Sequence, residues 1–138
     1  MISIQNIAEK FVDACETGKG WEACRDYCQP DATFSVQAGA LEGVNTLEAY
    51  TEWMKGMMIP LTGGSYEVRA FATDEDRKKV IMYGVFRATH TGEGGPVPPT
   101  GKQMETDYVY VMDFEGDCIQ KMTKIWNDGY ATKQLGWA

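Results

Sequence analysis

Two neighbouring segments near the C-terminus decide the fold: KQMETDYVYVMDF at residues 102–114 and CIQKMTKIWND at residues 118–128. In the first, the charged residues Glu105, Asp107 and Asp113 alternate with apolar ones, as in a strand with one solvated face. The three residues between the segments, EGD at 115–117, are typical of a tight turn. The pattern therefore predicts a long antiparallel hairpin.

The same pattern extends toward the N-terminus. Residues 80–91 predict another long strand, which should pair antiparallel with 102–114 across the loop GEGGPVPPTG. Shorter strands are expected at 66–73 and 32–38. Apolar residues at spacings of three and four predict helices at 3–17 and 21–28, and a third helix from Asn45 or Thr46 to Pro60. A short helix near 131–135 closes the chain.

This order of elements predicts the fold class α+β, with three N-terminal helices packed on a strongly bent antiparallel sheet. Helices across the concave side of such a sheet form a cone, whose open end is a usual place for a ligand. The length of 138 residues fits one domain over residues 1–138, and 43% hydrophobic with 24% charged residues is typical of a globular protein.

Composition also excludes some classes of function. The net charge of −7 argues against nucleic acid as a partner, because phosphates would be repelled. No basic segment followed by an apolar run begins the chain, and no stretch approaches about 18 apolar residues, so we expect no membrane association and a cytoplasmic protein. Cys15, Cys24, Cys28 and Cys118 are expected to be free thiols, and no metal-ligand spacing is present.

Several short motifs lie at the ends of the predicted strands. THTGE at 89–93 ends one long strand, PPTGK at 98–102 opens the next, and WND at 126–128 is followed by QLG at 134–136. Together with PDATF at 30–34 after the first helices, these motifs resemble the nuclear transport factor 2-like superfamily, and within it the SnoaL-like polyketide cyclases. The resemblance covers nearly the whole chain.

This resemblance implies acid–base chemistry without a cofactor on a small hydrophobic molecule that carries a carbonyl group. In the cyclases an aspartate at the end of the last long strand moves a proton during an aldol ring closure. That position is Asp128 here, and the strand-end histidine of the family is His90. The chain departs from the family at Gly94-Gly95-Pro96-Val97, where a bulky apolar residue is common, so a more open rim is expected.

The chemistry of both candidates agrees with such roles, but each has a structural alternative. Burial in an apolar pocket would raise the pKa of Asp128 and suit it to general acid–base catalysis; the alternative is that Asp128 caps the closing helix. The imidazole of His90 could stabilise an enolate; the alternative is a rim histidine bonded to a loop carbonyl.

Aromatic residues predict the wall of the pocket. Trp126 is the strongest candidate, because period two places it on the same face as Asp128, Lys124 and Met122. The other predicted substrate-binding residues are Tyr108, Phe34, Trp53 and Phe86, for which the alternative is core packing.

Three functions stay open from the sequence: an enzyme of the cyclase or isomerase type, a non-catalytic domain that binds a small molecule, and a dimerisation domain. A homodimer is expected in any case, because helices cover the sheet on one side only.

Overall fold

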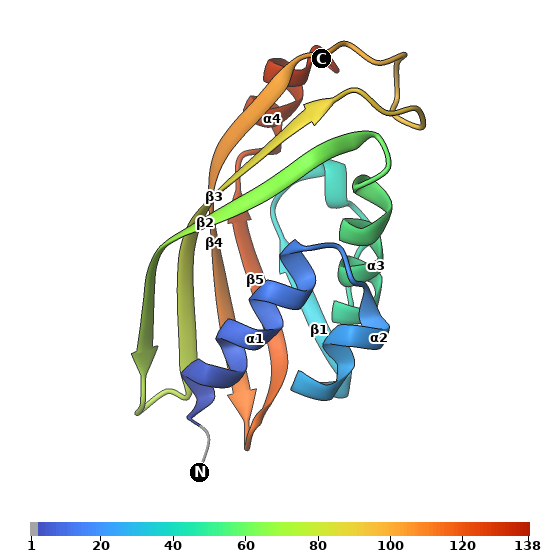
Figure 1. Ribbon diagram of the computed structural model, residues 1–138. Coiled ribbons are helices and arrows are strands. Elements are labelled where there is room, and N and C mark those ends of the chain that lie inside the picture. Colours follow the sequence, from blue (N-terminus) through green and yellow to red (C-terminus); the bar gives the residue numbers. More distant parts are fainter. Residues whose placement is uncertain (1–2) are drawn as a thin grey trace.

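The computed structural model describes residues 3–138. These residues form one curved sheet with a layer of helices on its inner face (Figure 1). The elements in chain order are α1 (Ile4–Glu16), α2 (Trp21–Cys24), β1 (Cys28–Val36), α3 (Leu47–Met57), β2 (Leu61–Asp74), β3 (Lys79–His90), β4 (Gln103–Glu115), β5 (Cys118–Trp126) and α4 (Asp128–Leu135). Short 3-10 turns follow α2 at Arg25–Tyr27 and precede α3 at Gly39–Leu41. The predicted α+β class is confirmed.

The strands run in the order β1-β5-β4-β3-β2. The predicted antiparallel pairing is confirmed for β3 with β4 and for β4 with β5, where Val80 lies opposite Met112 and Met112 opposite Met122. Gly116, with a φ of 61°, turns the chain between β4 and β5. The edge strand β1, however, pairs with β5 in parallel, which corrects the prediction of a wholly antiparallel sheet. A tight hairpin forces neighbouring strands to be antiparallel, whereas no hairpin joins β1 to β5.

Several element ends differ from the predicted ones. The second helix is one turn long, and β1 begins at Cys28, where a helix was expected to end. Strand β2 begins at Leu61 and runs through Gly63-Gly64, earlier than the predicted start at Tyr66. The closing helix begins at Asp128, earlier than predicted, so β5 ends at Trp126.

Two apolar cores hold the layers together. The larger one lies between α1–α3 and the sheet, and the apolar stripe of α1, with Phe11 and Val12, is buried in it. The smaller one lies under α4 at the other end of the sheet and contains Leu61, Ala88, Met104, Ala131 and Leu135. The sheet thus bridges two separate cores, and α4 covers the end that α1–α3 leave open (Figure 1).

Within residues 3–138, the helices lie on the inner face of the sheet and leave its outer face uncovered (Figure 1). Ile81 and Tyr83, which alternate with buried Val80 and Met82, are 40% and 38% exposed, and Ile125 is 59% exposed. The four cysteines are free thiols, as predicted, and three of them are buried. Among the described residues, no helix is both long and apolar enough to span a membrane.

Candidate active site

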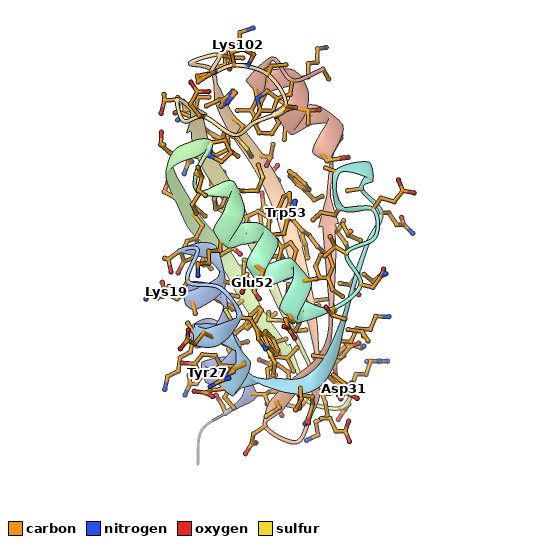
Figure 2. All side chains as sticks on the ribbon, turned by 90° about the vertical axis from the view of Figure 1, so that its right-hand side faces the viewer. Lys19, Tyr27, Asp31, Glu52, Trp53 and Lys102 are labelled. Carbon is orange, nitrogen blue, oxygen red and sulfur yellow. The ribbon has the colours of Figure 1, made fainter. Side chains whose placement is uncertain are left out.

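A cavity of about 190 Å³ lies between the two cores. Most of its wall is apolar and comes from α3, the inner face of the sheet and α4, with Met54, Met57, Met58, Leu61, Met104 and Leu135 among the contributors. Figure 2 looks onto α3, from which Trp53 reaches the wall. The size and lining suit one small hydrophobic molecule.

Two ionisable side chains of opposite charge interrupt the apolar wall. Glu16, the last residue of α1, is 2% exposed, and Lys124 of β5 is 6% exposed. Both line the cavity. Charged side chains are seldom buried so completely unless they are paired, so their partners decide what this end of the cavity can do.

Hydrogen bonds through two tyrosines join Lys124 to Glu16. The Lys124 ammonium donates to the Tyr50 hydroxyl at 2.9 Å, the Tyr50 and Tyr110 hydroxyls are 2.5 Å apart, and the Tyr110 hydroxyl donates to Oε1 of Glu16 at 2.6 Å. Because the proton of Tyr110 is used on Glu16, Tyr50 is the donor in the middle bond. The Tyr108 hydroxyl donates to Oε2 of Glu16 at 2.7 Å. We call these five residues the inner network.

Burial shifts the pKa values of Glu16 and Lys124 toward pH 7. It raises the pKa of Glu16, while the charge of Lys124 and the bonds from Tyr110 and Tyr108 oppose this. It lowers the pKa of Lys124 to about 8, although the Glu16 carboxylate acts in the opposite direction. Groups whose pKa values move toward physiological pH in a cavity are suited to proton transfer.

Aromatic rings surround the Lys124 ammonium. Its Nζ lies 4.1 Å from the centroid of the Trp126 ring and 5.8 Å from that of Trp53, and the rings of Tyr50, Tyr108 and Tyr110 lie between 5.2 and 5.9 Å. The indole of Trp126 is itself held by a bond from Nε1 to Oγ1 of Thr106 at 3.1 Å. Ring faces attract a cation, so this cage supports a positive charge at the end of Lys124.

The structure brings most of the predicted wall residues to the cavity. Trp126, Tyr108, Trp53 and Phe86 line it. Phe34 does not; it is buried in the larger core and stacks on Tyr50 with ring centroids 4.2 Å apart. Phe34 therefore lies behind the inner network and supports the position of one of its tyrosines.

Asp128 lies outside the lining of the cavity. Because β5 ends at Trp126, the alternation expected to place Asp128 beside Trp126 stops before it is reached. Asn127 caps α4 by accepting from the backbone N–H of Tyr130, and the half-buried Asp128 accepts from the backbone N–H of Ala40 at 2.8 Å. The predicted capping alternative thus falls on Asn127, and Asp128 ties the start of α4 to the turn before α3.

His90 is fully buried at the end of β3 and is also absent from the cavity lining. Its Nδ1 accepts from Nε1 of Trp137 at 2.8 Å and from the backbone N–H of Thr100 at 3.3 Å. Its Nε2 has no hydrogen-bond partner within the described part of the chain. A Cβ at Gly95 would come within 2.9 Å of this Nε2, so the glycine allows the loop to pass directly over the ring.

Sequence reasoning missed Glu16 as a site residue and named Lys124 only as a neighbour of Trp126. A signal existed for both. Glu16 follows Val12 by four residues and so continues the apolar stripe of α1, and Lys124 lies between Met122 and Trp126 on the inner face of β5. A charged residue on a face that is predicted to be buried indicates a candidate site residue.

Comparison with known proteins agrees with this architecture. The SnoaL-like domain family matches residues 8–122. IdmH, a putative polyketide cyclase from Streptomyces antibioticus, superposes with a TM-score of 0.78 at 18% identity, covering 98% of this chain and 99% of its own. No curated protein sequence is significantly similar.

Two further solved structures share the fold. An NTF2-like protein from Burkholderia thailandensis has a TM-score of 0.74 at 14% identity, covering 98% of both chains. A protein of ketosteroid isomerase-like fold from Catenulispora acidiphila, in complex with trimethylamine, has a TM-score of 0.71 at 12% identity, covering 96% of this chain and 93% of its own. The fold is therefore the nuclear transport factor 2-like cone.

Proposed function

The chain belongs to the SnoaL-like domain family, and we propose that it is a cofactor-independent acid–base enzyme acting on a small hydrophobic molecule with a carbonyl group. The observation that carries the proposal is that buried Glu16 and buried Lys124 line one apolar cavity and are joined through tyrosines. The reaction class is proton transfer next to the carbonyl, as in a cyclisation or isomerisation.

In the proposed reaction, Glu16 and Lys124 have different roles. The Glu16 carboxylate is the general base that removes a proton from the carbon beside the carbonyl, since its raised pKa makes it a stronger base than an exposed glutamate. The Lys124 ammonium has three N–H groups and gives one to Tyr50, so others remain to donate to the developing enolate oxygen. The apolar wall excludes water, which strengthens both interactions.

The roles predicted for Asp128 and His90 remain a rival assignment of the same chemistry. In that assignment the strand-end aspartate is the base, as the family resemblance implies. This assignment is weakened because neither residue belongs to the lining of the cavity. The inner network is favoured because three of its residues, Glu16, Tyr108 and Lys124, line the space that a substrate would occupy.

A non-catalytic binding domain is the second candidate function. The many methionines in the wall favour it, since their flexible side chains adapt to ligands of different shape. The trimethylamine complex of the Catenulispora protein also shows that a related fold can hold a small molecule without implying a reaction.

The test is exchange of the methyl protons of 2-acetonaphthone in deuterated buffer, followed by proton NMR. We expect the chain to accelerate exchange, and Glu16→Gln to lower the rate on the order of a hundredfold to ten-thousandfold because the base is lost. Asp128→Asn is the matched control, a carboxylate-to-amide change outside the cavity, and is expected to have little effect. Circular dichroism verifies that each variant is folded.

Two results would reassign the function. Loss of exchange in Asp128→Asn, with Glu16→Gln unaffected, would favour the strand-end assignment. Binding of the ketone without exchange above the buffer rate would favour the binding domain.

The homodimer remains a prediction. Ile81, Tyr83 and Ile125 on the outer face of the sheet support it. Val109 lies opposite both Tyr83 and Ile125, and contiguous exposed apolar side chains mark protein–protein contact sites. Light scattering of the native chain should give twice the monomer mass, and Ile125→Asp should shift the population to monomer. A monomer at micromolar and higher concentration would contradict the prediction.

A further inference from the structure

We propose that Lys124 is a nucleophile that forms a covalent imine with aldehydes or ketones in the cavity. This inference rests on the proposed function, because it assumes a carbonyl-bearing ligand in the same space. It goes further by assigning a bond-forming step and a nucleophilic atom, Nζ of Lys124. The acid–base mechanism requires neither of them.

The position of Lys124 supports this step. Lys124 is the only buried lysine among residues 3–138, and it lies in the cavity wall. Its Nζ makes one hydrogen bond to a side chain, that to Tyr50, and no carboxylate lies within ion-pair distance of it in the described residues. A lysine held for stability alone would usually contact its counter-charge directly. Here the counter-charge lies two tyrosines away, which leaves the amine free toward the cavity.

The inner network provides a route for the proton that must leave before the amine can attack. Along the inner network Lys124 donates to Tyr50, Tyr50 to Tyr110, and Tyr110 to Glu16. Moving each proton along its own bond yields a neutral amine on Lys124 and a protonated carboxyl on Glu16. Burial lowers the pKa of Lys124 and raises that of Glu16, so both shifts favour this transfer.

The steps balance without an added reagent. The neutral amine attacks the carbonyl carbon, a C–N bond forms, and the π electron pair moves to oxygen. A proton passes from nitrogen to that oxygen, which gives a carbinolamine. Glu16 then returns its proton to the hydroxyl, the C–O bond breaks, water leaves, and the nitrogen lone pair completes a protonated imine. One carbonyl and one ammonium become one protonated imine and one water.

The aromatic rings around Lys124 also suit the product of this reaction. The protonated imine keeps a positive charge at the position of the ammonium, 4.1 Å from the Trp126 ring centroid. The same ring faces and the Glu16 carboxylate therefore stabilise both the reactant and the product. An apolar wall also retains little water to reverse the reaction.

The test is reductive trapping with 2-naphthaldehyde and sodium cyanoborohydride, which converts an imine into a stable secondary amine. We expect the intact mass to increase by one naphthylmethyl group, mapped to Lys124 by peptide mass spectrometry. At pH 7.5 labelling of Lys124 should be about tenfold or more faster than that of the exposed lysines, because more of its amine is neutral. Lys124→Met should remove this label.

Matched controls distinguish labelling of Lys124 in the cavity from labelling of lysines on the surface. Lys121→Met changes an exposed lysine on the same strand and should leave the labelling of Lys124 intact. In the native chain, excess 2-naphthylmethanol, which lacks a carbonyl, should compete for the cavity and suppress the label. This competition needs no variant, so it holds even if Lys124→Met folds poorly.

Failure of the imine can be distinguished from failure of the proposed function. Calorimetry reports binding of 2-naphthylmethanol independently of any covalent step. Binding without a label on Lys124 overturns the imine and leaves the acid–base enzyme standing. Equal labelling of exposed lysines, unaffected by 2-naphthylmethanol, also overturns the imine. Absence of binding together with absence of ketone exchange would overturn the proposed function itself.

Discussion

Lys124 and Asp128 are four residues apart, yet their surroundings have little in common. Lys124 is the next-to-last inward-facing residue of β5, and it is buried among aromatic rings at the cavity. Asp128 begins α4, remains half-buried and accepts from a backbone N–H of a neighbouring turn. The chain changes from strand to helix between them, and this change separates a side chain in the cavity from one at the rim.

The inner network also differs from the surroundings of His90. The inner network carries two opposite charges that are removed from water and joined by hydroxyl groups. At the rim, His90 receives N–H bonds from Trp137 and Thr100, which hold the end of the chain and the 91–101 loop against β3. Desolvation together with a charged partner, more than a place at a strand end, therefore makes a group chemically distinctive here.

The largest expected effect is that of Glu16→Gln on stability. The change leaves the Lys124 ammonium buried without its counter-charge, and removing one partner of such a pair costs about 3 kcal/mol. The free energy of unfolding, measured in urea near pH 7, should fall by about this amount. The double variant Glu16→Gln with Lys124→Met should recover most of the loss. Purely additive effects would show that the two groups are not coupled.

The next effect is the dependence of stability on pH. Burial lowers the pKa of Lys124 from 10.5 to about 8. Between about pH 8 and 10.5 the unfolded chain therefore binds more protons than the folded chain, so this lysine makes stability rise with pH in that window. The shift corresponds to about 3 kcal/mol, which is the penalty fully present below pH 8.

Comparison with Lys124→Met isolates that contribution, because thiols and tyrosines titrate in both chains. Urea denaturation at pH 7 and at pH 9.5 should show the native chain gaining stability relative to the variant. An equal pH dependence in the two chains would mean that the lysine is charged to the same extent in the folded and unfolded states. In Glu16→Gln the pKa of Lys124 should fall further, which NMR of labelled lysine side chains can follow.

The smallest effect is expected at the rim. Trp137→Phe retains an aromatic ring against His90 and removes the N–H that Nδ1 accepts at 2.8 Å. Loss of one neutral hydrogen bond should reduce the free energy of unfolding by about 1 kcal/mol. If Trp137→Phe lowered the free energy of unfolding as much as Glu16→Gln, the surroundings of His90 and the inner network would not differ in their contribution to stability. Thermal unfolding followed by circular dichroism is sufficient to rank them.

Much of the fold could be predicted because it depends on local patterns. Period two along residues 102–114 and 118–128, with Gly116 between them, requires a hairpin whichever way the rest of the chain packs. The parallel pairing of β1 with β5 could not be predicted in this way. It joins Phe34 to Met122 across most of the chain, and no turn between them sets the direction.

The residues of the candidate site also differ in whether local sequence patterns could place them. Trp126, Tyr108, Trp53 and Phe86 could be placed at the cavity because they are large, apolar and on predicted inner faces. Asp128 was assigned to that face because β5 was expected to reach it. The side chain of Asn127, which accepts from Tyr130 N–H, instead caps a helix that begins at Asp128.

By itself, the sequence determined the class of fold, the long hairpins and the family, because these follow from periodicity, turn residues and motifs that lie close together in the chain. Only the tertiary structure decided which charged groups share the cavity. Glu16 at the end of α1, Tyr50 on α3 and Lys124 on β5 are brought together when the helices pack on the sheet. Their pKa values are shifted by that packing, because burial and the proximity of charges exist only once the chain is folded.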